Sequence, residues 1–308
     1  MTMMRFATLT AVCLFFVAVV TGCQSGSRAE EPLTSKQKAA TPSQQVAAKD
    51  VAEDESSADV IVVGAGISGL TTALELGRGG ARVTVIDMSS VYGGHAVMSQ
   101  GSLCLIGSPV QKERGIVDSP ELAYNDFLTF GEDPNEAWVR YYVDHSITEI
   151  YDWVTELGVR FETVYASPGN SADREHQPFG RGIGLVTPIY RACLEQPTVR
   201  FLWNNKVEQL LTENGRVVGV KAIDQRTGAE KTLHASSVVL ATGGFQSNLD
   251  MVREYWPEEF RFPERILLGS GRNSVGWGHK LAQEIGGDLV KMDHQWNYYT
   301  GIPDPRYP

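Results

Sequence analysis

The chain has 308 residues, which is enough for one large domain or two modest ones. Its formal net charge is −10, and no stripe of Lys and Arg stands out that would neutralise phosphates, which argues against a nucleic-acid partner. We interpret the acidity as a solvated surface of mixed charge.

The first 22 residues have the pattern of an export signal. Arg5 precedes an apolar run over residues 6–20 that is too short to indicate a membrane span, and Cys23 follows a Thr-Gly pair. The pattern resembles the signal of bacterial lipoproteins, in which the peptide is cut before the cysteine and the thiol carries lipid. The resemblance implies an exported protein that Cys23 anchors to the outer membrane or a periplasmic face, and Gln24 fits outer-membrane sorting. An ordinary export signal cut nearby is the alternative.

Residues 23–57 are predicted to form a flexible tether. After Cys23, Ser, Ala, Gln, Lys and Glu dominate and no aromatic residue occurs, so the segment cannot bury enough surface to fold. The later cysteines, Cys104 and Cys193, lie in apolar or helical contexts, and a disulfide between them does not follow from the sequence. The lack of CxxC and HxxxH patterns argues against a metal cluster or a c-type haem.

Residues 59–87 predict a complete βαβ unit. Residues 60–63 are a continuous apolar, β-branched run, typical of a strand buried on both faces. A helix with one apolar face follows, and a second strand ends at Asp87. The glycines between the first strand and the helix have the spacing GxGxxG and are Gly64, Gly66 and Gly69. The apolar helical face consists of Leu70, Ala73, Leu74 and Gly77.

This unit indicates a dinucleotide site. The first glycine makes a tight turn, the second lets the backbone approach a pyrophosphate, and the third lets the helix pack on the strand. The helix N-terminus attracts the phosphate charge, and Asp87 would accept hydrogen bonds from the adenosine ribose. NAD and FAD share this device, so the unit alone does not choose between them.

The segment after Asp87, MSSVYGGHAVMSQG, favours FAD. It is a glycine-punctuated loop that resembles a flavoprotein family of soluble fumarate reductases, succinate dehydrogenase flavoprotein subunits, urocanate reductases and 3-ketosteroid dehydrogenases. The resemblance implies that this segment runs along the pyrophosphate and the flavin of FAD. An NAD-binding dehydrogenase is the less favoured alternative. The FAD contacts expected up to this point are Gly64, Ala65, Gly66, Ile67, Ser68, Gly69, Asp87, Met88, Gly93, Gly94, His95, Ala96, Ser99, Gln100 and Gly101.

Further segments carry the same resemblance. Residues 238–245, VVLATGGF, predict a buried strand that ends where the family's flavin domain gives way to an inserted substrate domain. Residues 204–237 predict two alternating strands around the turn ENGR and a third after RTG, a meander that lies beside the adenine in the family. Residues 174–184, and the helix predicted after them, also resemble a segment of this flavoprotein family. The FAD contacts implied here are the backbone of Val207 and Ala241, Thr242 and Gly243.

His95 matches the histidine that membrane-bound succinate dehydrogenases and fumarate reductases link covalently to flavin, whereas the soluble reductases carry Asn. A covalent bond raises the reduction potential of the flavin. Two alternatives stay open: FAD bonded covalently through His95, or a hydrogen bond from His95 to the isoalloxazine or a phosphate. We favour the hydrogen bond, because covalent attachment needs more than one residue. His176, in a glycine-rich loop, is the other histidine singled out.

Two helices are predicted between residues 118 and 158. The first begins at Asp118 and Ser119 with Pro120 in its first turn, and the second begins likewise at Asp133 and Pro134. We interpret the apolar stripe of the second helix as core packing. The stripe consists of Val139, Val143, Ile147, Ile150, Tyr151 and Val154.

The predicted domains are an FAD-binding domain over residues 58–250 and the incomplete start of a substrate cap domain over residues 251–308. Residues 273–301 resemble the family's Gly-Asp-Gly turn, helix and strand, but Trp277 replaces the Asp of that turn. The family's His-Pro-Thr, which binds a substrate carboxylate, is also replaced, and a tyrosine hydroxyl suits a less charged or carbonyl substrate. The residues aligned with it are Tyr298, Tyr299 and Thr300.

The predicted fold class is α/β, a Rossmann-like FAD-binding domain with a β-meander and the start of an inserted α+β cap domain. The resemblance implies hydride transfer between flavin N5 and an activated carbon–carbon double bond of an unsaturated acid or ketone, with electrons from a separate donor. No residue is identified as the general acid. The family's proton-donating arginine and second flavin segment are not found, so we expect a truncated or split flavoprotein. The alternative function is a catalytically incomplete FAD-binding fragment that needs a second chain.

Overall fold

The computed structural model describes residues 56–268 and 271–295. Internal contacts divide the chain into the units Met1–Ala52 and Glu53–Pro308, and the described residues belong to the second unit. Among the described helices, none has both the length and the hydropathy that crossing a membrane requires. The expectations for the signal, for Cys23, for nearly all of the tether and for residues 298–300 concern parts of the chain outside the described residues.

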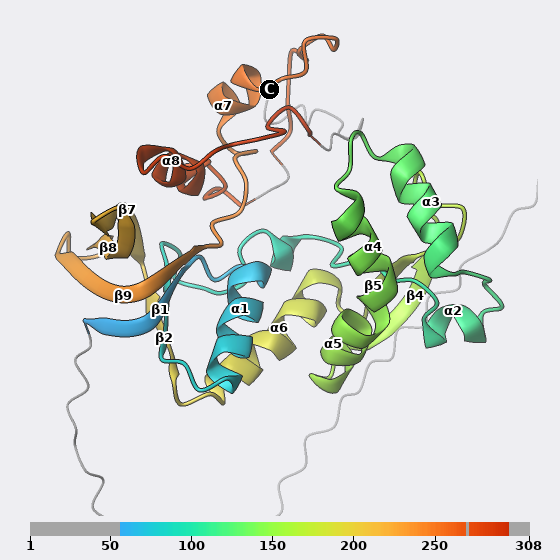
Figure 1. The fold of residues 1–308 in the computed structure, drawn as a ribbon, viewed down its shortest axis with the longest axis horizontal. Coiled ribbons are helices and arrows are strands. Elements are labelled where there is room, and N and C mark those ends of the chain that lie inside the picture. The colour runs from blue at the N-terminus through green and yellow to red at the C-terminus, as the bar shows by residue number, and fades with distance from the viewer. Residues whose placement is uncertain (1–55, 269–270, 296–308) are drawn as a thin grey trace, which may run out of the picture. The chain divides into compact units, whose positions relative to one another are not determined.

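A six-stranded sheet organises the described part of the chain (Figure 1). The strand order is β6-β2-β1-β9-β8-β7, in which the first four strands run parallel and β8 and β7 join by antiparallel pairing. The bounds are β1 (Ser57–Val63), β2 (Val83–Asp87), β6 (Val199–Trp203), β7 (Asn205–Glu213), β8 (Arg216–Asp224) and β9 (Glu230–Leu240). The sheet confirms the predicted α/β class with its meander. The edge strand β6 was not predicted.

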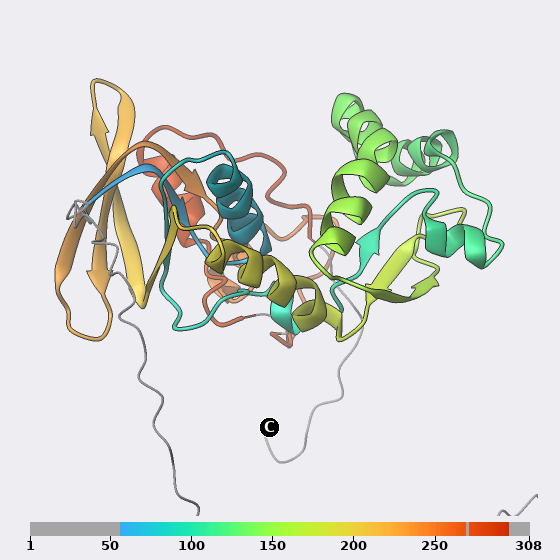
Figure 2. The ribbon, with the colours of Figure 1, turned by 90° about the horizontal axis from the view of Figure 1, so that it is seen from below.

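Two helices cover one face of this sheet. α1 (Ile67–Arg78) and α6 (Arg181–Leu194) lie side by side in both ribbon views (Figures 1 and 2). They share a buried cluster with strand residues such as Val62 and Val85, to which α6 contributes Ile189. The predicted apolar face of α1 is confirmed, because Leu70, Ala73, Leu74 and Gly77 are all buried.

Helix α8 (Trp277–Glu284) contacts the other face of the sheet. Its Leu281 lies in a cluster with Ile61, Ile86 and Val207. Successive strand side chains point to opposite faces, which is why these residues alternate with those that contact α1. The region predicted as a cap therefore contributes to the core of the sheet, while the predicted domain boundary stays a prediction.

One continuous strand replaces two predicted ones. β9 contains both the third strand of the meander and the strand of the VVLATGGF motif. Its first part pairs antiparallel with β8, for example Lys231 with Ala222, and its second part pairs parallel with β1, for example Val238 with Ile61. The strand predicted at Val238–Leu240 is formed, but the prediction that it is buried is wrong, because neighbouring residues cover these three side chains only in part.

The strand expected after α8 is not formed in residues 286–295. Residues 287–290 have no strand partner among the described residues, and turns follow them. Lys291 has φ +54°, in the left-handed region that interrupts extended backbone. The short helix α7 (Leu249–Glu254) precedes this region and is capped by the side chain of Asn248, which accepts a hydrogen bond from the Met251 N–H.

A second, three-stranded sheet was not predicted. Its order is β3-β5-β4, and both pairings are antiparallel. The strands are β3 (Leu103–Cys104), β4 (Phe161–Tyr165) and β5 (Glu175–Pro178). The other elements between β2 and β5 are the 3-10 helix η1 (Ala96–Met98), α2 (Pro109–Glu113), α3 (Pro120–Phe130), α4 (Glu136–His145), the π-helix η2 (Ser146–Tyr151) and α5 (Asp152–Glu156).

The two helices predicted in this region differ in how well they were placed. α3 begins as expected, with the Ser119 hydroxyl accepting from the Leu122 N–H. The second helix begins at Glu136 rather than at Asp133 and Pro134, because Asn135 is its cap and Asp133 has φ +49°. The single predicted helix is three segments, α4, η2 and α5. Of its stripe, Val143 and Val154 are buried, and Val139, Ile147, Ile150 and Tyr151 are half-buried.

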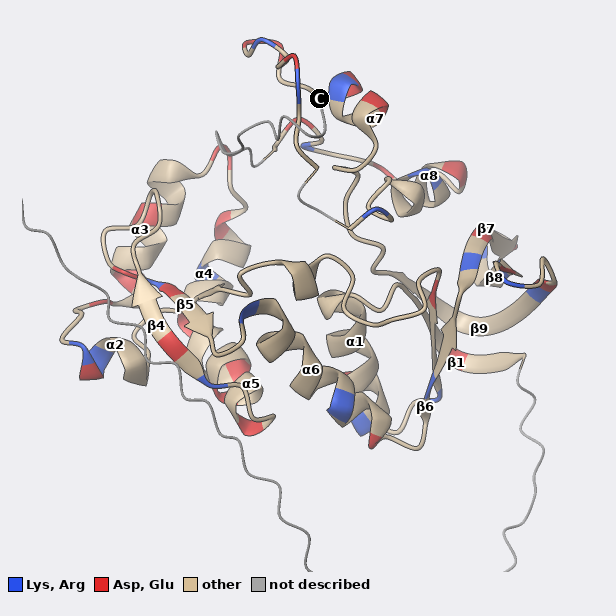
Figure 3. Cartoon of the chain, turned by 180° about the vertical axis from the view of Figure 1, so that it is seen from behind, with Lys and Arg blue, Asp and Glu red and all other residues tan. Residues whose placement is uncertain are grey.

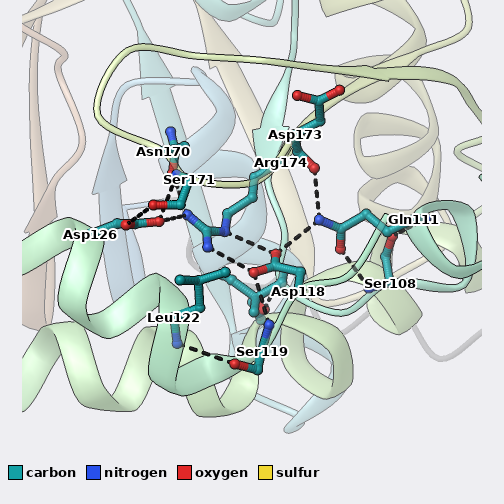
Figure 4. Close-up of polar contacts among 12 residues, drawn as sticks. Ser108, Gln111, Asp118, Ser119, Leu122, Asp126, Asn170, Ser171, Asp173 and Arg174 are labelled. Carbon is teal, nitrogen blue, oxygen red and sulfur yellow. Dashed lines mark hydrogen bonds and ion pairs between the residues drawn. The ribbon is translucent and has the colours of Figure 1, made fainter. Parts of the chain in front are cut away.

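A buried arginine joins the helices of this region to the second sheet (Figure 4). The Arg174 side chain has 0% exposure and pairs with Asp118 at 2.7 Å and with Asp126 at 2.5 Å. Its Nη1 also donates to Asn170 Oδ1, and Gln111 donates to the Asp118 carboxylate. Because a buried charge must be compensated, these partners make Arg174 a structural centre of the region. No local sequence pattern points to this arginine.

Candidate cofactor site

The glycine loop between β1 and α1 is closed on two sides by backbone. Gly64 has φ +107°, and a Cβ there would lie 2.3 Å from the carbonyl oxygen of Ala241. A Cβ on Gly69 would lie 1.9 Å from the carbonyl oxygen of Gly64. Side chains at these two positions would displace the loop or the helix, so the sequence expectation for the first and third glycines fits the structure.

Gly66, between them, borders open space. A Cβ built there meets no atom within 4 Å, and Gly66 is the N-cap of α1 with no side chain bonded to the helix end. No acidic residue lies in the first turn of α1. The N-terminal N–H groups of a helix carry a partial positive charge, and backbone reaches an anion most closely at a glycine. The loop therefore fits the diphosphate of a dinucleotide.

Asp87, at the end of β2, is tied to this loop. Its Oδ2 accepts a hydrogen bond of 2.6 Å from the Ala65 N–H, and its Oδ1 accepts one of 2.6 Å from the Ser89 N–H. Burial raises the pKa of the Asp87 carboxyl. Each carboxylate oxygen accepts more than one hydrogen bond, so a ribose hydroxyl can still bind here. The role of Asp87 in holding the loop was not foreseen from the sequence.

The segment predicted to follow the flavin lies against the glycine loop. The Gly93 N–H donates to the Ala65 carbonyl, and a Cβ on Gly94 would lie 3.3 Å from the Gly66 Cα. Further along, a Cβ on Gly101 would lie 2.7 Å from the backbone nitrogen of Gly182, at the start of α6. The segment is thus seated between the N-terminal ends of α1 and α6.

The side chains of this segment vary in exposure. His95 is exposed and precedes η1, and its imidazole has no hydrogen-bond partner within the described part of the chain. Ala96 and Ser99 are half-buried, and the Ser99 hydroxyl accepts from the Gly101 N–H. Gln100 is exposed and accepts from Gln177. His95 and Gln100 are thus accessible to a ligand.

The segment after β9 lies beside the glycine loop. The Ala241 N–H donates to the Val63 carbonyl, and a Cβ on Gly278 would lie 2.0 Å from the Thr242 hydroxyl, which places Thr242 against the start of α8. Gly243 has φ +73°. The glycine loop and this segment therefore meet at the carboxyl ends of the parallel strands, where ligands bind in open α/β sheets.

Trp277 is a residue of the site that contacts the backbone of Val207. Val207 is 2% exposed, and its carbonyl accepts a hydrogen bond of 2.6 Å from the Trp277 indole N–H. The ammonium groups of Lys206 and Lys280 lie 3.8 Å and 4.8 Å from the Trp277 ring centroid. Trp277 therefore borders the predicted adenine position. The sequence showed the substitution at this turn but not the contact with β7.

His176 belongs to the core and not to this site. It is fully buried, and its Nδ1 donates to the Arg174 carbonyl at 2.6 Å while its Nε2 lies 2.5 Å from the Ser108 hydroxyl. Burial lowers the pKa of the imidazole, which keeps it neutral. In the described residues, no group of three or more His, Cys, Asp and Glu is placed to hold a metal ion.

Charge is mixed over the described elements. Figure 3 shows residues of both signs along the described elements, and the charged residues of α3 are acidic while those of α6 are basic. The feature of this site that suits an anion is the backbone of the glycine loop and the N-terminus of α1.

The comparisons with known proteins agree with this geometry. Residues 59–307 match the family model described as FAD binding domain. The chain is 34% identical over 286 residues to a KsdD-like steroid dehydrogenase of Mycobacterium tuberculosis, covering 82% of this chain and 50% of that one. It is 31% identical over 240 residues to the fumarate reductase (cytochrome) of Shewanella frigidimarina, covering 77% and 41%.

A solved structure gives the same assignment. The 3-ketosteroid-Δ4-(5α)-dehydrogenase from Rhodococcus jostii RHA1, in complex with 4-androstene-3,17-dione, matches with a TM-score of 0.69 at 30% identity, over 80% of this chain and 57% of that one. The fold and the site thus define a dinucleotide-binding flavoprotein. The chain belongs to the FAD-binding domain family, which confirms the resemblance and FAD as the cofactor. The chain spans about half the length of the curated relatives that it matches.

Proposed function

We propose that this protein is an FAD-dependent oxidoreductase that acts on the carbon–carbon bond beside a carbonyl or carboxylate. The observation that carries the proposal is the open cradle at Gly66, closed by backbone at Gly64 and Gly69. When bound, FAD supplies hydride transfer at its N5 atom. Relatives named as steroid dehydrogenases, urocanate reductase and fumarate reductases support this kind of substrate.

In this proposal the residues of the chain bind FAD and orient it against the substrate. The N–H groups at the start of α1 bind the diphosphate, and Asp87 accepts from the ribose while it holds Ala65 in the loop. Residues 93–101 position the isoalloxazine against the substrate, and Trp277 borders the adenine. Binding of this kind fixes the distance and angle of the reacting atoms, which is where such an enzyme gains rate.

The test is an assay of the purified chain with FAD, an artificial electron donor or acceptor, and a panel of unsaturated acids and ketones. Turnover of any panel member by this chain alone supports the proposal. The second candidate is an FAD-binding fragment that needs a second chain for activity. Turnover by the chain alone would exclude this candidate.

His95 is proposed to contact the flavin. Its exposure next to the flavin segment supports this contact and leaves open both a covalent bond and a hydrogen bond. Acid precipitation of the FAD-loaded protein distinguishes the two. Colour that stays with the pellet and is lost in His95→Ala indicates the covalent bond, and colour that goes to the supernatant indicates the hydrogen bond.

We also propose that the protein is exported, carries lipid on Cys23 and receives electrons from a separate donor. The sequence pattern before Cys23 supports the export and the lipid anchor. Metabolic labelling with a radioactive fatty acid tests the anchor. The label is expected on the wild-type protein and not on Cys23→Ser, and a wild-type protein without label would exclude it.

A further inference from the structure

The second sheet presents a polar face beside the flavin segment. In its register Cys104 lies opposite Glu175, which lies opposite Tyr165, so these three side chains share one face. Thr163 and Gln177, also paired, lie on the same face. Because side chains alternate along each strand, Ser102 and the hydroxyl of Tyr165 meet there as well.

The opposite face of this sheet is part of the core. Leu103, His176 and Val164 lie across from one another in the register. His176 and Val164 are buried, and Leu103 packs with the cluster of Val154, Val159 and Leu185. The sheet is thus covered on one side, and the polar face is the side that remains for a ligand.

One hydrogen bond connects this face to the flavin segment, and a second lies directly after the segment ends. Gln177 donates to the Gln100 side chain at 2.9 Å, and Gln100 belongs to the segment expected along the flavin. Ser102, which follows Gly101 directly, lies 2.6 Å from the Tyr165 hydroxyl. Tyr165 is 38% exposed. The Ser102–Tyr165 pair therefore stands at the end of the flavin segment and is open to a ligand.

The Ser102–Tyr165 hydroxyl pair can donate one hydrogen bond to a ligand. Of its two O–H groups, one donates within the pair, and the other is available to an acceptor on a ligand. A carbonyl oxygen is such an acceptor. A donor aimed at that oxygen also stabilises the negative charge that builds on it when the β-carbon of the double bond accepts hydride, or, in the reverse direction, when the α-carbon loses its proton.

The charges around this face favour a neutral ligand over a dicarboxylate. Glu175 lies on the face itself, and burial raises the pKa of its carboxyl. The guanidinium of Arg174, which directly precedes this strand, is paired with Asp118 and Asp126. Arg114 reaches the edge of the face, where it donates to the Thr163 hydroxyl and the Glu162 carbonyl. Both cations are thus already engaged, and the face offers a ligand mainly hydroxyl and amide groups.

We propose that the Tyr165–Ser102 hydroxyl pair binds the carbonyl oxygen of a neutral, unsaturated ketone and thereby sets the substrate class of this protein. The inference rests on the proposed function, because it places the substrate beside the flavin segment at residues 93–101. Tyr165 is the last residue of β4, and Ser102 directly precedes β3.

The test measures ligand binding by the FAD-loaded chain. Wild type, Tyr165→Phe and Ser102→Ala are titrated with 4-androstene-3,17-dione and, separately, with fumarate, and the change in the visible absorption of the bound flavin is recorded. Tyr141→Phe is the matched control, because the Tyr141 hydroxyl is also exposed but donates to Glu149 between α4 and η2. FAD affinity is measured for every variant first.

The dione is expected to perturb the flavin spectrum of the wild type. Its dissociation constant is expected to rise about tenfold in Tyr165→Phe, the loss of roughly one hydrogen bond, and to stay unchanged in Tyr141→Phe. An unchanged dissociation constant in Tyr165→Phe, or a flavin that responds to fumarate alone or to neither ligand, would overturn the inference while FAD binding stands. A wild-type chain that binds no FAD would instead overturn the proposed function.

Discussion

The Asp87 carboxylate accepts a 2.6 Å hydrogen bond from the backbone N–H of Ala65, 22 residues earlier in the chain. This bond joins the end of β2 to the glycine loop after β1. The two parallel strands thus hold the loop in one conformation before any ligand arrives. Because a preorganised loop loses less entropy on binding, we propose that Asp87 supports FAD affinity through the loop as well as through the ribose.

Asp87→Asn is expected to weaken FAD binding about tenfold or more. An amide can replace only one acceptor oxygen, so the N–H of Ala65 or of Ser89 loses its partner. The dissociation constant is measured by quenching of FAD fluorescence. Asp224→Asn is the matched control, since Asp224 also accepts from backbone N–H groups, those of Arg226 and Thr227, in the turn between β8 and β9. Equal losses in both variants would refute the role of Asp87.

The substitutions Gly66→Ala and Gly69→Ala are expected to have different effects: the first weakens FAD binding, and the second lowers the stability of the fold. At Gly66 the methyl group enters open space, so the thermal midpoint stays within a few degrees while FAD binding weakens at least about tenfold. At Gly69 the methyl group meets the Gly64 carbonyl, and the free energy of unfolding falls by about 1–3 kcal/mol. Thermal unfolding and FAD titration of both variants are the measurements. A Gly66→Ala chain with wild-type FAD affinity would contradict the cradle.

Loss of one partner of Arg174 is expected to destabilise the chain strongly. Asp126→Asn leaves a buried guanidinium with incomplete compensation, and the free energy of unfolding should fall by about 3 kcal/mol. Glu121→Gln is the control, because Glu121 is 76% exposed where it pairs with Arg140, and it should cost under about 1 kcal/mol. Urea unfolding measures both, and similar losses would argue against the central role of Arg174.

The buried His176 predicts a pH dependence of stability. Burial lowers its pKa in the folded chain, whereas an unfolded histidine titrates near its ordinary value of about 6.5. As the pH falls below that value the unfolded state takes up a proton that the folded state does not. The free energy of unfolding therefore falls, by at most about 1.4 kcal/mol per pH unit for one group.

His176→Gln should flatten this dependence between pH 7 and pH 5, roughly the range over which the unfolded histidine titrates. His234→Gln, at an exposed position on β9, should retain it. Urea unfolding at several pH values gives the slope for each variant. A slope in His176→Gln that equals the wild-type slope would show that other groups cause the acid sensitivity.

The parts that could be predicted from the sequence are those encoded locally. The βαβ unit follows from one apolar run, three glycines and one helical face within residues 59–87, and every step of it depends on near neighbours. The meander likewise follows from alternating strands and short turns. These elements place the glycine loop and Asp87, so the phosphate end of the site was predictable.

The parts that were missed depend on distant pairings. The second sheet joins Leu103 to His176, and its strands are short and carry few β-branched residues. The hydrogen bond from Trp277 to Val207 spans 70 residues. Neither leaves a local pattern. The proposed substrate contacts and the adenine border lie in these regions, which is why the sequence identified the cofactor but not the residues that face the substrate.

Titration of the purified chain with FAD tests the central claim most directly. The account predicts a saturable quenching of flavin fluorescence in the wild type, no comparable binding of NAD, and a large loss of FAD affinity in Gly66→Ala at unchanged thermal stability. A folded wild-type chain that leaves FAD fluorescence unchanged, or that prefers NAD, would contradict it.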